Sequence, residues 1–200
     1  MIAIIDYGMG NLASVEKALK YLGLKCIVTS DHNHIKSSSG IILPGVGSFE
    51  QGINNLKDRG LDKTLYKEVI DNNKLFLGIC LGMQLIMENG SEPRPSKGLS
   101  WIKGNVEPIN NIELPIPHLG WNNIYSQNED MPKDNIENNF YFIHSFHVVP
   151  YENVQKQWVN YEFPMVASLK KGNIHATQFH PEKSQSAGLE YLKKIFQDHA

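Results

Sequence analysis

Short apolar runs alternate with helix-like segments through the first half of the chain, and this order limits the possible folds more than any other feature. Residues 11–22 are the clearest helix, with Leu12, Val15, Leu19 and Leu22 at helical spacing. The expected strands are 2–5, 24–29, 40–43 and 75–79, and the other expected helices are 49–72, with a break near residue 60, and 81 to about 88. Repeated strand-then-helix order with short connections predicts a parallel sheet covered by helices on both faces.

The pattern changes from about residue 99, where short β-type runs follow one another with Pro and Asn between them. These runs are 101–109, 116–125, 140–149 and 163–174. They predict antiparallel strands that extend the same core. Residues 184–199 read as a final helix whose inward face carries Leu189, Leu192, Ile195 and Phe196. We therefore expect one α/β domain over residues 1–200, with a mixed, mostly parallel central sheet flanked by helices.

Length, charge and cysteine content narrow the class of protein. A chain of 200 residues and 22.6 kDa buries about 70% of its extended surface, enough for one core without disulfides or metals. The net charge of −2 offers no basic field for nucleic acid or an anionic membrane. The opening apolar run stops at Asp6, too short for a signal peptide, and no stretch approaches 18 apolar residues. With two cysteines, the sequence predicts a reduced cytoplasmic protein without metal or cofactor.

Cys80 is the leading candidate nucleophile. Residues 78–82 read Gly-Ile-Cys-Leu-Gly, a G-x-C-x-G motif between an apolar run and a helix. This is the thiol version of the nucleophile elbow, in which the glycines permit a sharp turn that exposes the reactive atom. Unpaired N–H groups at the helix start stabilise a thiolate. The alternative for Cys80 is a buried structural cysteine in a tight turn. Cys26 lies within a plain apolar run, and a small core residue is the better interpretation for it.

A thiol nucleophile needs a base that a third group orients. His180 ends a β-type run, Pro181 fixes the backbone after it, and Glu182 follows at a distance that lets its carboxylate reach the imidazole ring. The rival is His144, which has no adjacent carboxylate and reads as part of a binding wall. The sequence therefore predicts a Cys80, His180 and Glu182 triad.

A glycine-rich turn follows the third predicted strand. Residues 44–48 read Pro-Gly-Val-Gly-Ser, and they leave the sheet at the same edge as Cys80. Backbone N–H groups of Gly45, Val46 and Gly47 are candidates to stabilise an oxyanion. An ordinary glycine turn is the alternative. Neither this turn nor residues 8–10 match a phosphate-binding motif.

These motifs resemble those of the class I (triad) glutamine amidotransferase family. Residues 78–84, Gly-Ile-Cys-Leu-Gly-Met-Gln, and 178–184, Gln-Phe-His-Pro-Glu-Lys-Ser, match the family's two signatures in the family's order. Segments 4–12, 43–49, 117–122 and 141–146 extend the resemblance over essentially the whole chain. The resemblance implies that Cys80 forms a glutamyl thioester, that His180 handles the protons, and that Glu182 orients His180. It also implies that residues 44–47 supply the oxyanion hole after a backbone rearrangement set by a partner.

The same resemblance assigns further positions by their match to the family. Positions that hold L-glutamine correspond to Gln84, Ser145 and Phe146, the last two chiefly through their backbone. Positions near the mouth where ammonia leaves correspond to Gly10, Asn11, Tyr141 and Lys183. The implied partner is a (β/α)₈ cyclase or synthase subunit that forms a heterodimer with the chain.

The resemblance implies a glutaminase of histidine biosynthesis, and three alternatives to this interpretation stay open. Residues 89–101 and 115–118 depart from the family pattern outside the triad. A similar glutaminase that supplies ammonia for amidino-sugars of surface polysaccharide is the second candidate. A non-catalytic binding module on the same fold is disfavoured by the intact triad. A cysteine peptidase or other thiol hydrolase has no need of Gln84.

Overall fold

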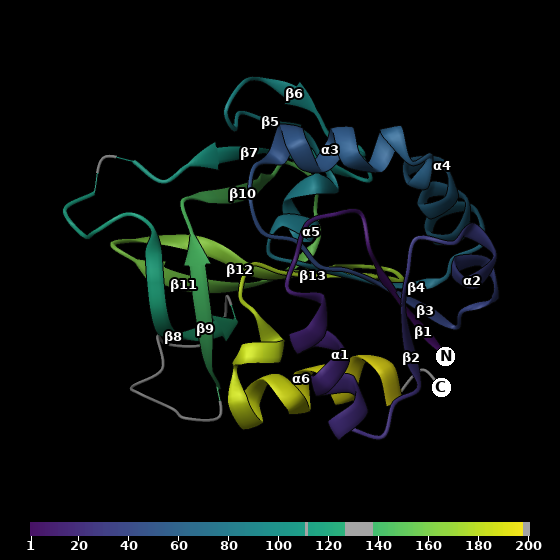
Figure 1. The fold of residues 1–200 in the computed structure, drawn as a ribbon. Helices are drawn as coiled ribbons and strands as arrows, with labels where there is room; N and C mark the ends of the chain where they lie inside the picture. The colour runs from purple at the N-terminus through teal and green to yellow at the C-terminus, as the bar shows by residue number, and fades with distance from the viewer. Residues whose placement is uncertain (111, 127–137, 198–200) are drawn as a thin grey trace.

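The computed structural model describes residues 1–110, 112–126 and 138–197. A nine-stranded sheet crosses the molecule, as Figure 1 shows. Its parallel strands are β1 (Ile2–Ile5), β2 (Cys26–Thr29), β3 (Gly40–Leu43), β4 (Leu75–Ile79) and β13 (Ile174–Thr177). Its other strands are β12 (Phe163–Lys171), β11 (Gln155–Tyr161), β8 (His118–Ser126) and β9 (Asn139–His144). The order is β2-β1-β3-β4-β13-β12-β11-β8-β9. Its four parallel and four antiparallel pairings confirm the predicted mixed sheet, but the sheet is half parallel and not mostly parallel.

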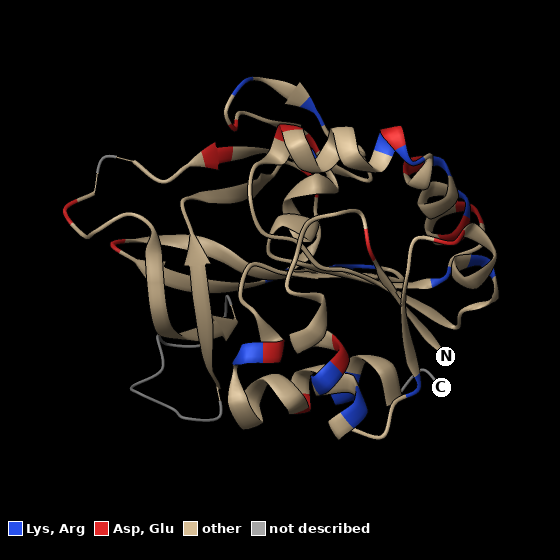
Figure 2. Cartoon of the chain, in the orientation of Figure 1, with Lys and Arg blue, Asp and Glu red and all other residues tan. Residues whose placement is uncertain are grey.

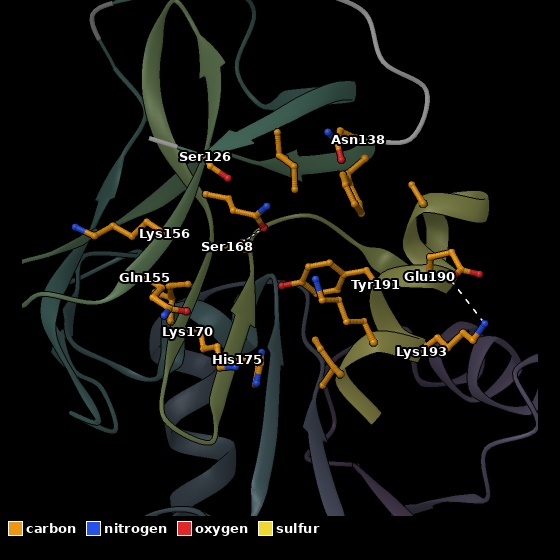
Figure 3. A pocket seen from close by; sticks show the side chains of 17 residues that line it. Ser126, Asn138, Gln155, Lys156, Ser168, Lys170, His175, Glu190, Tyr191 and Lys193 are labelled. Carbon is orange, nitrogen blue, oxygen red and sulfur yellow. Dashed lines mark hydrogen bonds and ion pairs between the residues drawn. The ribbon is translucent and has the colours of Figure 1, made fainter. Parts of the chain in front are cut away.

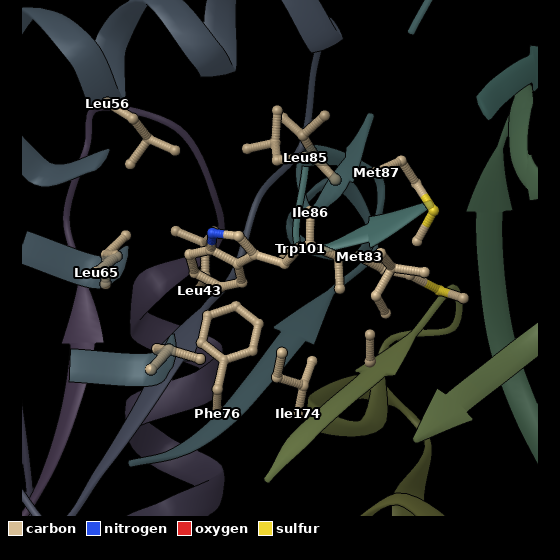
Figure 4. Close-up of a cluster of buried hydrophobic side chains, with 14 of the residues drawn as sticks. Leu43, Leu56, Leu65, Phe76, Met83, Leu85, Ile86, Met87, Trp101 and Ile174 are labelled. Atoms are coloured by element: carbon tan, nitrogen blue, oxygen red, sulfur yellow. The ribbon is translucent and has the colours of Figure 1, made fainter. Parts of the chain in front are cut away.

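Helices cover both faces of this sheet. On one face lie α1 (Leu12–Tyr21) and α6 (Gln185–Gln197), and on the other lie α3 (Phe49–Asp58), α4 (Leu61–Tyr66) and α5 (Leu81–Leu85). Leu19 and Leu192 join the core of the first face, while Leu56, Phe76 and Trp101 join the second core, which Figure 4 shows. The predicted break in helix 49–72 is confirmed at Gly60, whose φ of 64° lies in the left-handed region.

Several elements differ from the prediction. The helix after Cys80 ends at Leu85, because the following chain pairs as β5 (Met87–Gly90) in a separate sheet with β6 (Ser96–Lys97), β7 (Ile102–Pro108) and β10 (Phe146–Pro150). The sheet order is β10-β7-β5-β6. The run 140–149 divides at Ser145 between the two sheets. Strands β5, β6 and β11 and the helix α2 (His32–Ser37) were not predicted. The predicted run 163–174 ends as β12 at Lys171, and β13 follows as a separate strand that pairs parallel to β4. Residues 198 and 199 of the predicted last helix lie outside the described residues.

Positive and negative side chains are interspersed on the helices, and they are absent from strands β8 and β9 at one end of the large sheet. Figure 2 shows acidic and basic residues interspersed on α1, α3 and α4, whereas β8 and β9 contain no Lys, Arg, Asp or Glu. Among the helices of the described part, none combines the length and apolarity that crossing a bilayer requires.

A buried ion pair joins Glu68 of the π-helical turn η1 (Lys67–Asp71) to Lys74, whose ammonium also contacts α2. Lys74 Nζ lies 2.7 Å from Glu68 Oε2, and the two side chains are 11% and 7% exposed. The same ammonium donates to the carbonyls of Ile35 and Lys36 at 2.9 and 2.7 Å. Burial would raise the pKa of Glu68, but hydrogen bonds from Lys74 and Asn72 hold it below its usual value.

We expect Lys74→Met to lower the free energy of unfolding by about 3–5 kcal/mol, because it leaves the Glu68 charge buried without a partner. Lys67→Met is the matched control, since its partner Asp71 is exposed and such surface pairs contribute about 0–1 kcal/mol. Urea unfolding of both variants measures the difference. In the wild type, the contribution of Glu68 is present at neutral pH and is lost as the pH falls through its lowered pKa. Equal stability of the two variants would contradict this account.

Candidate active site

Three adjacent parallel strands bring the predicted catalytic segments together. Strand β4 lies between β3 and β13, and Ile79 pairs with Thr177 at their carboxyl ends. Residues 44–47 follow β3, Cys80 follows β4, and the segment with His180 follows β13. The carboxyl ends of parallel strands meet at one edge, where ligands bind in sheets of this kind. The expected meeting of the 44–47 turn with Cys80 is thus observed.

Cys80 occupies a strained corner between β4 and α5. Its φ of 53° and ψ of −105° are unusual for a residue with a side chain, and such conformations concentrate at functional sites. Its N–H donates to Thr177 O at 2.7 Å, which fixes the turn against β13. A Cβ atom on Gly82 would lie 1.8 Å from Leu43 O, so only glycine fits there. The second glycine of the motif is therefore required by the close approach of α5 to β3.

His180 and Glu182 form a buried pair. Nδ1 of His180 lies 2.8 Å from Glu182 Oε1, and both side chains are 2% exposed. A carboxylate oxygen can only accept, so Nδ1 carries a proton and Nε2 faces the reaction. Burial alone would lower the pKa of His180, but the neighbouring Cys80 and Glu182 raise it to about 10. Within the described residues Nε2 has no hydrogen-bond partner of ordinary geometry. This nitrogen is therefore available for proton transfer.

Two glutamine side chains link the sulfur to the predicted substrate site. Gln178 Nε2 donates to Cys80 Sγ at 3.7 Å, and Gln84 Nε2 lies 3.3 Å from Gln178 Oε1 and 3.1 Å from Phe146 O. The thiol itself is 3.9 Å from Ile143 O, which can only accept. Once the thiol is ionised, the Gln178 amide can donate a hydrogen bond to the sulfur. No separate role was predicted for Gln178, although it stands two residues before His180, the spacing that returns a side chain to the same side of an extended chain.

We expect Gln178→Leu to raise the pH midpoint of Cys80 alkylation by about 1–2 units. A hydrogen bond to a charged group contributes about 1.5–3 kcal/mol, and one pKa unit is about 1.4 kcal/mol. The measurement is the rate of iodoacetamide labelling against pH in a Cys26→Ser background, which leaves one thiol. Gln51→Leu is the control, because Gln51 lies exposed on α3. An unchanged midpoint in Gln178→Leu would show that Gln178 does not act on the Cys80 sulfur.

A buried histidine pair supports the Phe146 carbonyl from behind. His144 Nδ1 lies 2.9 Å from Phe146 O, and His144 Nε2 lies 2.9 Å from His118 Nδ1. Asn122 Nδ2 lies 3.4 Å from His118 Nε2. Burial lowers the pKa of His144 to about 3 and that of His118 to about 4, so both rings are neutral. Since Phe146 O only accepts, every donor in this chain points from Asn122 toward Phe146. His144 thus lies behind the wall it was predicted to form.

The predicted oxyanion loop, residues 44–47, has an orientation that does not support catalysis. Gly45 O accepts a hydrogen bond from Leu81 N at 3.3 Å. In nucleophile-elbow sites, the N–H that follows the nucleophile is one of the oxyanion donors. Here that N–H is occupied by the loop's own carbonyl. Val46 is 44% exposed, and Gly47 has a φ of 110°, which glycine adopts without strain. In this conformation the Gly45 carbonyl therefore blocks the N–H group that would serve as an oxyanion donor.

The remaining predicted residues lie around this centre. Ser145 O is bonded to Ile109 N at 2.8 Å, so its N–H is the backbone group left for a ligand. A Cβ atom on Gly10 would lie 3.4 Å from Gly45 Cα, which places the predicted partner-facing loop directly on the oxyanion loop. Asn11 caps α1 through Oδ1, which accepts from Ser14 N at 3.4 Å.

Tyr141 and Lys183 lie together at the rim. Lys183 Nζ is 5.6 Å from the centre of the Tyr141 ring, within the range of a cation–π contact. The Tyr141 ring is 6.5 Å from the His180 ring, and Tyr141 O accepts from His180 N at 2.9 Å. Lys183 is exposed and Tyr141 half-buried, so this predicted mouth pair lies at the surface next to His180.

Two other features lie apart from this centre. Cys26 is partly buried against the α1 face, and burial raises the pKa of its thiol. A cavity of about 930 Å³ lies between α6 and strands β11, β12 and β13. Figure 3 shows its lining side chains. Its lining includes Lys156, Lys170 and Tyr191 but none of the predicted catalytic or substrate residues. The predicted chemistry therefore belongs to the strand ends and not to this cavity.

Comparison with known proteins agrees with the predicted family. The glutamine amidotransferase class-I family matches residues 3–198. The imidazole glycerol phosphate synthase subunit HisH 1 of Campylobacter jejuni is 42% identical over 198 residues, covering 98% of each chain. Subunit HisH of Methanocaldococcus jannaschii is 44% identical over 199 residues, again covering 98% of each chain.

Solved structures agree on the fold. A crystal structure of a glutamine amidotransferase superposes with a TM-score of 0.73 at 16% identity, covering 98% of each chain. PurLQS from Thermotoga maritima superposes with a TM-score of 0.72 at 17% identity, covering 99% of this chain and 97% of that one. The fold predicted from the sequence is confirmed by these neighbours. Because the family match and the HisH relatives extend over nearly all of its sequence, the chain belongs to the class-I glutamine amidotransferases and is a glutamine-hydrolysing enzyme.

Proposed function

We propose that the chain is the glutaminase subunit of an imidazole glycerol phosphate synthase and passes ammonia to a (β/α)₈ synthase subunit in histidine biosynthesis. The observation that carries this proposal is identity of 41–44% to HisH subunits over nearly the whole chain. The triad geometry supports the glutaminase half of the proposal. We also propose that residues 1–200 act as one amidotransferase domain in the cytoplasm, where a reducing environment keeps Cys80 free.

The proposed chemistry follows from the proton positions. The Cys80 thiolate attacks the glutamine carboxamide, and a carbon–sulfur bond forms as the carbonyl oxygen becomes an oxyanion. His180 Nε2–H then gives its proton to the departing nitrogen, and ammonia leaves behind a glutamyl thioester. Neutral Nε2 next takes a proton from water, whose oxygen attacks the thioester and releases glutamate. Glu182 accepts the hydrogen bond from Nδ1 and holds the imidazolium in place.

We propose that substrate is held beside the sulfur by the groups already in place there. The Gln84 side chain and the Ser145 and Phe146 backbone line this position. Gln84 is 4% exposed and bonded on two sides, so it presents a fixed amide to a ligand. The histidine pair behind Phe146 supports that backbone.

The closed oxyanion hole supports control by the partner. A free glutaminase would release ammonia with no acceptor present, and the Gly45–Leu81 hydrogen bond withholds one donor from the oxyanion. One such donor contributes about 2.7–4 kcal/mol to the transition state, or roughly 10²–10³ in rate. We propose that the partner, with its ligand bound, turns the loop over.

An uncharged apolar surface supports docking beside the mouth. Leu119, Trp121 and Ile143 are 58%, 45% and 38% exposed, and they share one face of the β8–β9 pair. Trp121 also contacts the rim residue Tyr141 edge-on, with 5.9 Å between ring centres. Exposed apolar side chains gathered at a functional site mark a protein interface. We propose that the (β/α)₈ subunit covers this surface together with Gly10, Asn11, Tyr141 and Lys183.

Steady-state glutamate production tests the proposal in three mixtures: the chain alone, the chain with the synthase subunit, and both with the ligand of the synthase subunit. We expect the chain alone to be nearly inactive and the full mixture to be at least about 10²-fold faster. Full activity of the chain alone would contradict the switch and favour a free-standing hydrolase. Activation by an amidino-sugar amidotransferase, and not by the histidine-pathway subunit, would replace the pathway with the second candidate.

A further inference from the structure

Tyr7 carries a buried hydroxyl that the fold does not use. The residue follows β1, and its side chain is fully buried in the core that faces α3 and α5. Among the described residues, Oη has no hydrogen-bond partner. Burial, with the negative charge of Cys80 adding to it, holds the pKa of Tyr7 above its usual range, so the hydroxyl keeps its proton. A buried donor without an acceptor is rare in native proteins and calls for a physical reason.

The hydroxyl lies against the oxyanion loop. A Cβ atom built on Gly45 would stand 2.1 Å from Tyr7 Oη, so the oxygen occupies the space beside that backbone. The carbonyl of the same residue is the group that occupies Leu81 N–H. Gly45 therefore has a carbonyl that already accepts a hydrogen bond, and it lies against the Tyr7 hydroxyl, a donor without an acceptor.

Opening the oxyanion hole exchanges these partners. To free Leu81 N–H, the peptide after Gly45 must rotate, and its carbonyl then loses its donor in a buried position. A buried carbonyl needs another donor. We propose that Tyr7 is a positioning residue whose hydroxyl receives the Gly45 carbonyl when the oxyanion hole opens. This inference rests on the proposed loop switch, and it names the group that stabilises the open form.

Tyr7→Phe tests this role because it keeps the ring and removes only the donor. A tenfold change in the equilibrium between closed and open loop corresponds to about 1.4 kcal/mol, the contribution of one hydrogen bond. We therefore expect the glutaminase kcat of the isolated chain to fall about 10-fold, with KM for glutamine unchanged. In the complex with ligand-bound synthase subunit, the loss is no larger. The free energy of unfolding does not fall, because the hydroxyl is unpartnered in the closed form.

Tyr66→Phe is the matched control, since Tyr66 is 49% exposed. If the isolated chain turns over too slowly, the inactivation rate of Cys80 by a glutamine-analogue electrophile gives the same comparison. Unchanged kcat in Tyr7→Phe, or a loss of kcat accompanied by an equal loss of unfolding stability, would overturn the role of Tyr7. Failure of the wild-type chain to respond to the synthase subunit would overturn the proposed function instead, because the Tyr7 comparison needs no partner.

Discussion

Replacing Cys80 by serine is expected to lower glutamine hydrolysis by on the order of 10⁴-fold or more. A serine hydroxyl ionises far above neutral pH, so the imidazole of His180 has no comparable nucleophile to activate. The substitution is close to isosteric, and the strained corner at φ 53° is kept by its glycine neighbours and by the Cys80 N–H bond to Thr177 O. We therefore expect the variant to fold and to bind its partner.

Glutamate release and ammonium-driven synthase activity, measured in the same complex, separate chemistry from assembly. The first should vanish in Cys80→Ser and the second should survive, because the partner performs the synthase step. Cys26→Ser is the control and should keep both activities, since Cys26 begins β2, and strands β1 and β3 lie between β2 and β4 in the sheet. Glutamine-dependent turnover by Cys80→Ser would sink the assignment, as would equal labelling of Cys26 by a glutamine-analogue electrophile.

Loss of His180 should lower the rate by about 10²–10⁴-fold, the usual contribution of general acid–base catalysis. Glu182→Gln should cost less, because the amide still accepts from Nδ1 at the same place. Without the carboxylate charge, the pKa of His180 falls from about 10. The imidazolium then loses its proton at lower pH, so activity should decline from a less alkaline pH than in the wild type.

Rates of glutamate production by His180→Ala and Glu182→Gln between pH 6 and 10 measure both effects. The pH range spans the ordinary histidine pKa and the raised one. Greater damage from Glu182→Gln than from His180→Ala would require the two roles to be exchanged. If activity declines at the same alkaline pH in Glu182→Gln as in the wild type, the Glu182 carboxylate does not control the titration of His180.

The predictable parts of the site are those determined by residues close together in the sequence. The elbow around Cys80 and the His180–Glu182 spacing are each contained within five residues, and strand order does the rest by placing β4 beside β13. The closed state of the loop was not predictable, because it depends on which way one peptide of residues 44–47 points. The same is true of the His118–His144 contact, whose members are 26 residues apart and carry no motif.

The fold shows the same division between local and distant determinants. Strand β3 was predicted with its observed bounds, because four apolar residues end at a Pro-Gly turn. The helix after Cys80 was predicted too long, because residues 86–90 have a helix-compatible pattern and their conformation is decided by β7, which begins at Ile102. Backbone N–H groups of Trp101 and Ile102 both donate to Ile86 O, and this pairing ends the helix.

The 3.3 Å bond between Leu81 N and Gly45 O has a consequence for how glutamine is conserved in the cell. If the partner accelerates hydrolysis 10²-fold by shifting this loop, the open form makes up about 1% of the free chain, a gap of about 2.7 kcal/mol. Single substitutions commonly change free energies by 0.5–3 kcal/mol. A single substitution that stabilises the open loop could therefore give a chain that hydrolyses glutamine with no acceptor for the ammonia. Selection against this wasteful hydrolysis must act on the packing beneath the loop as firmly as selection for activity acts on the triad.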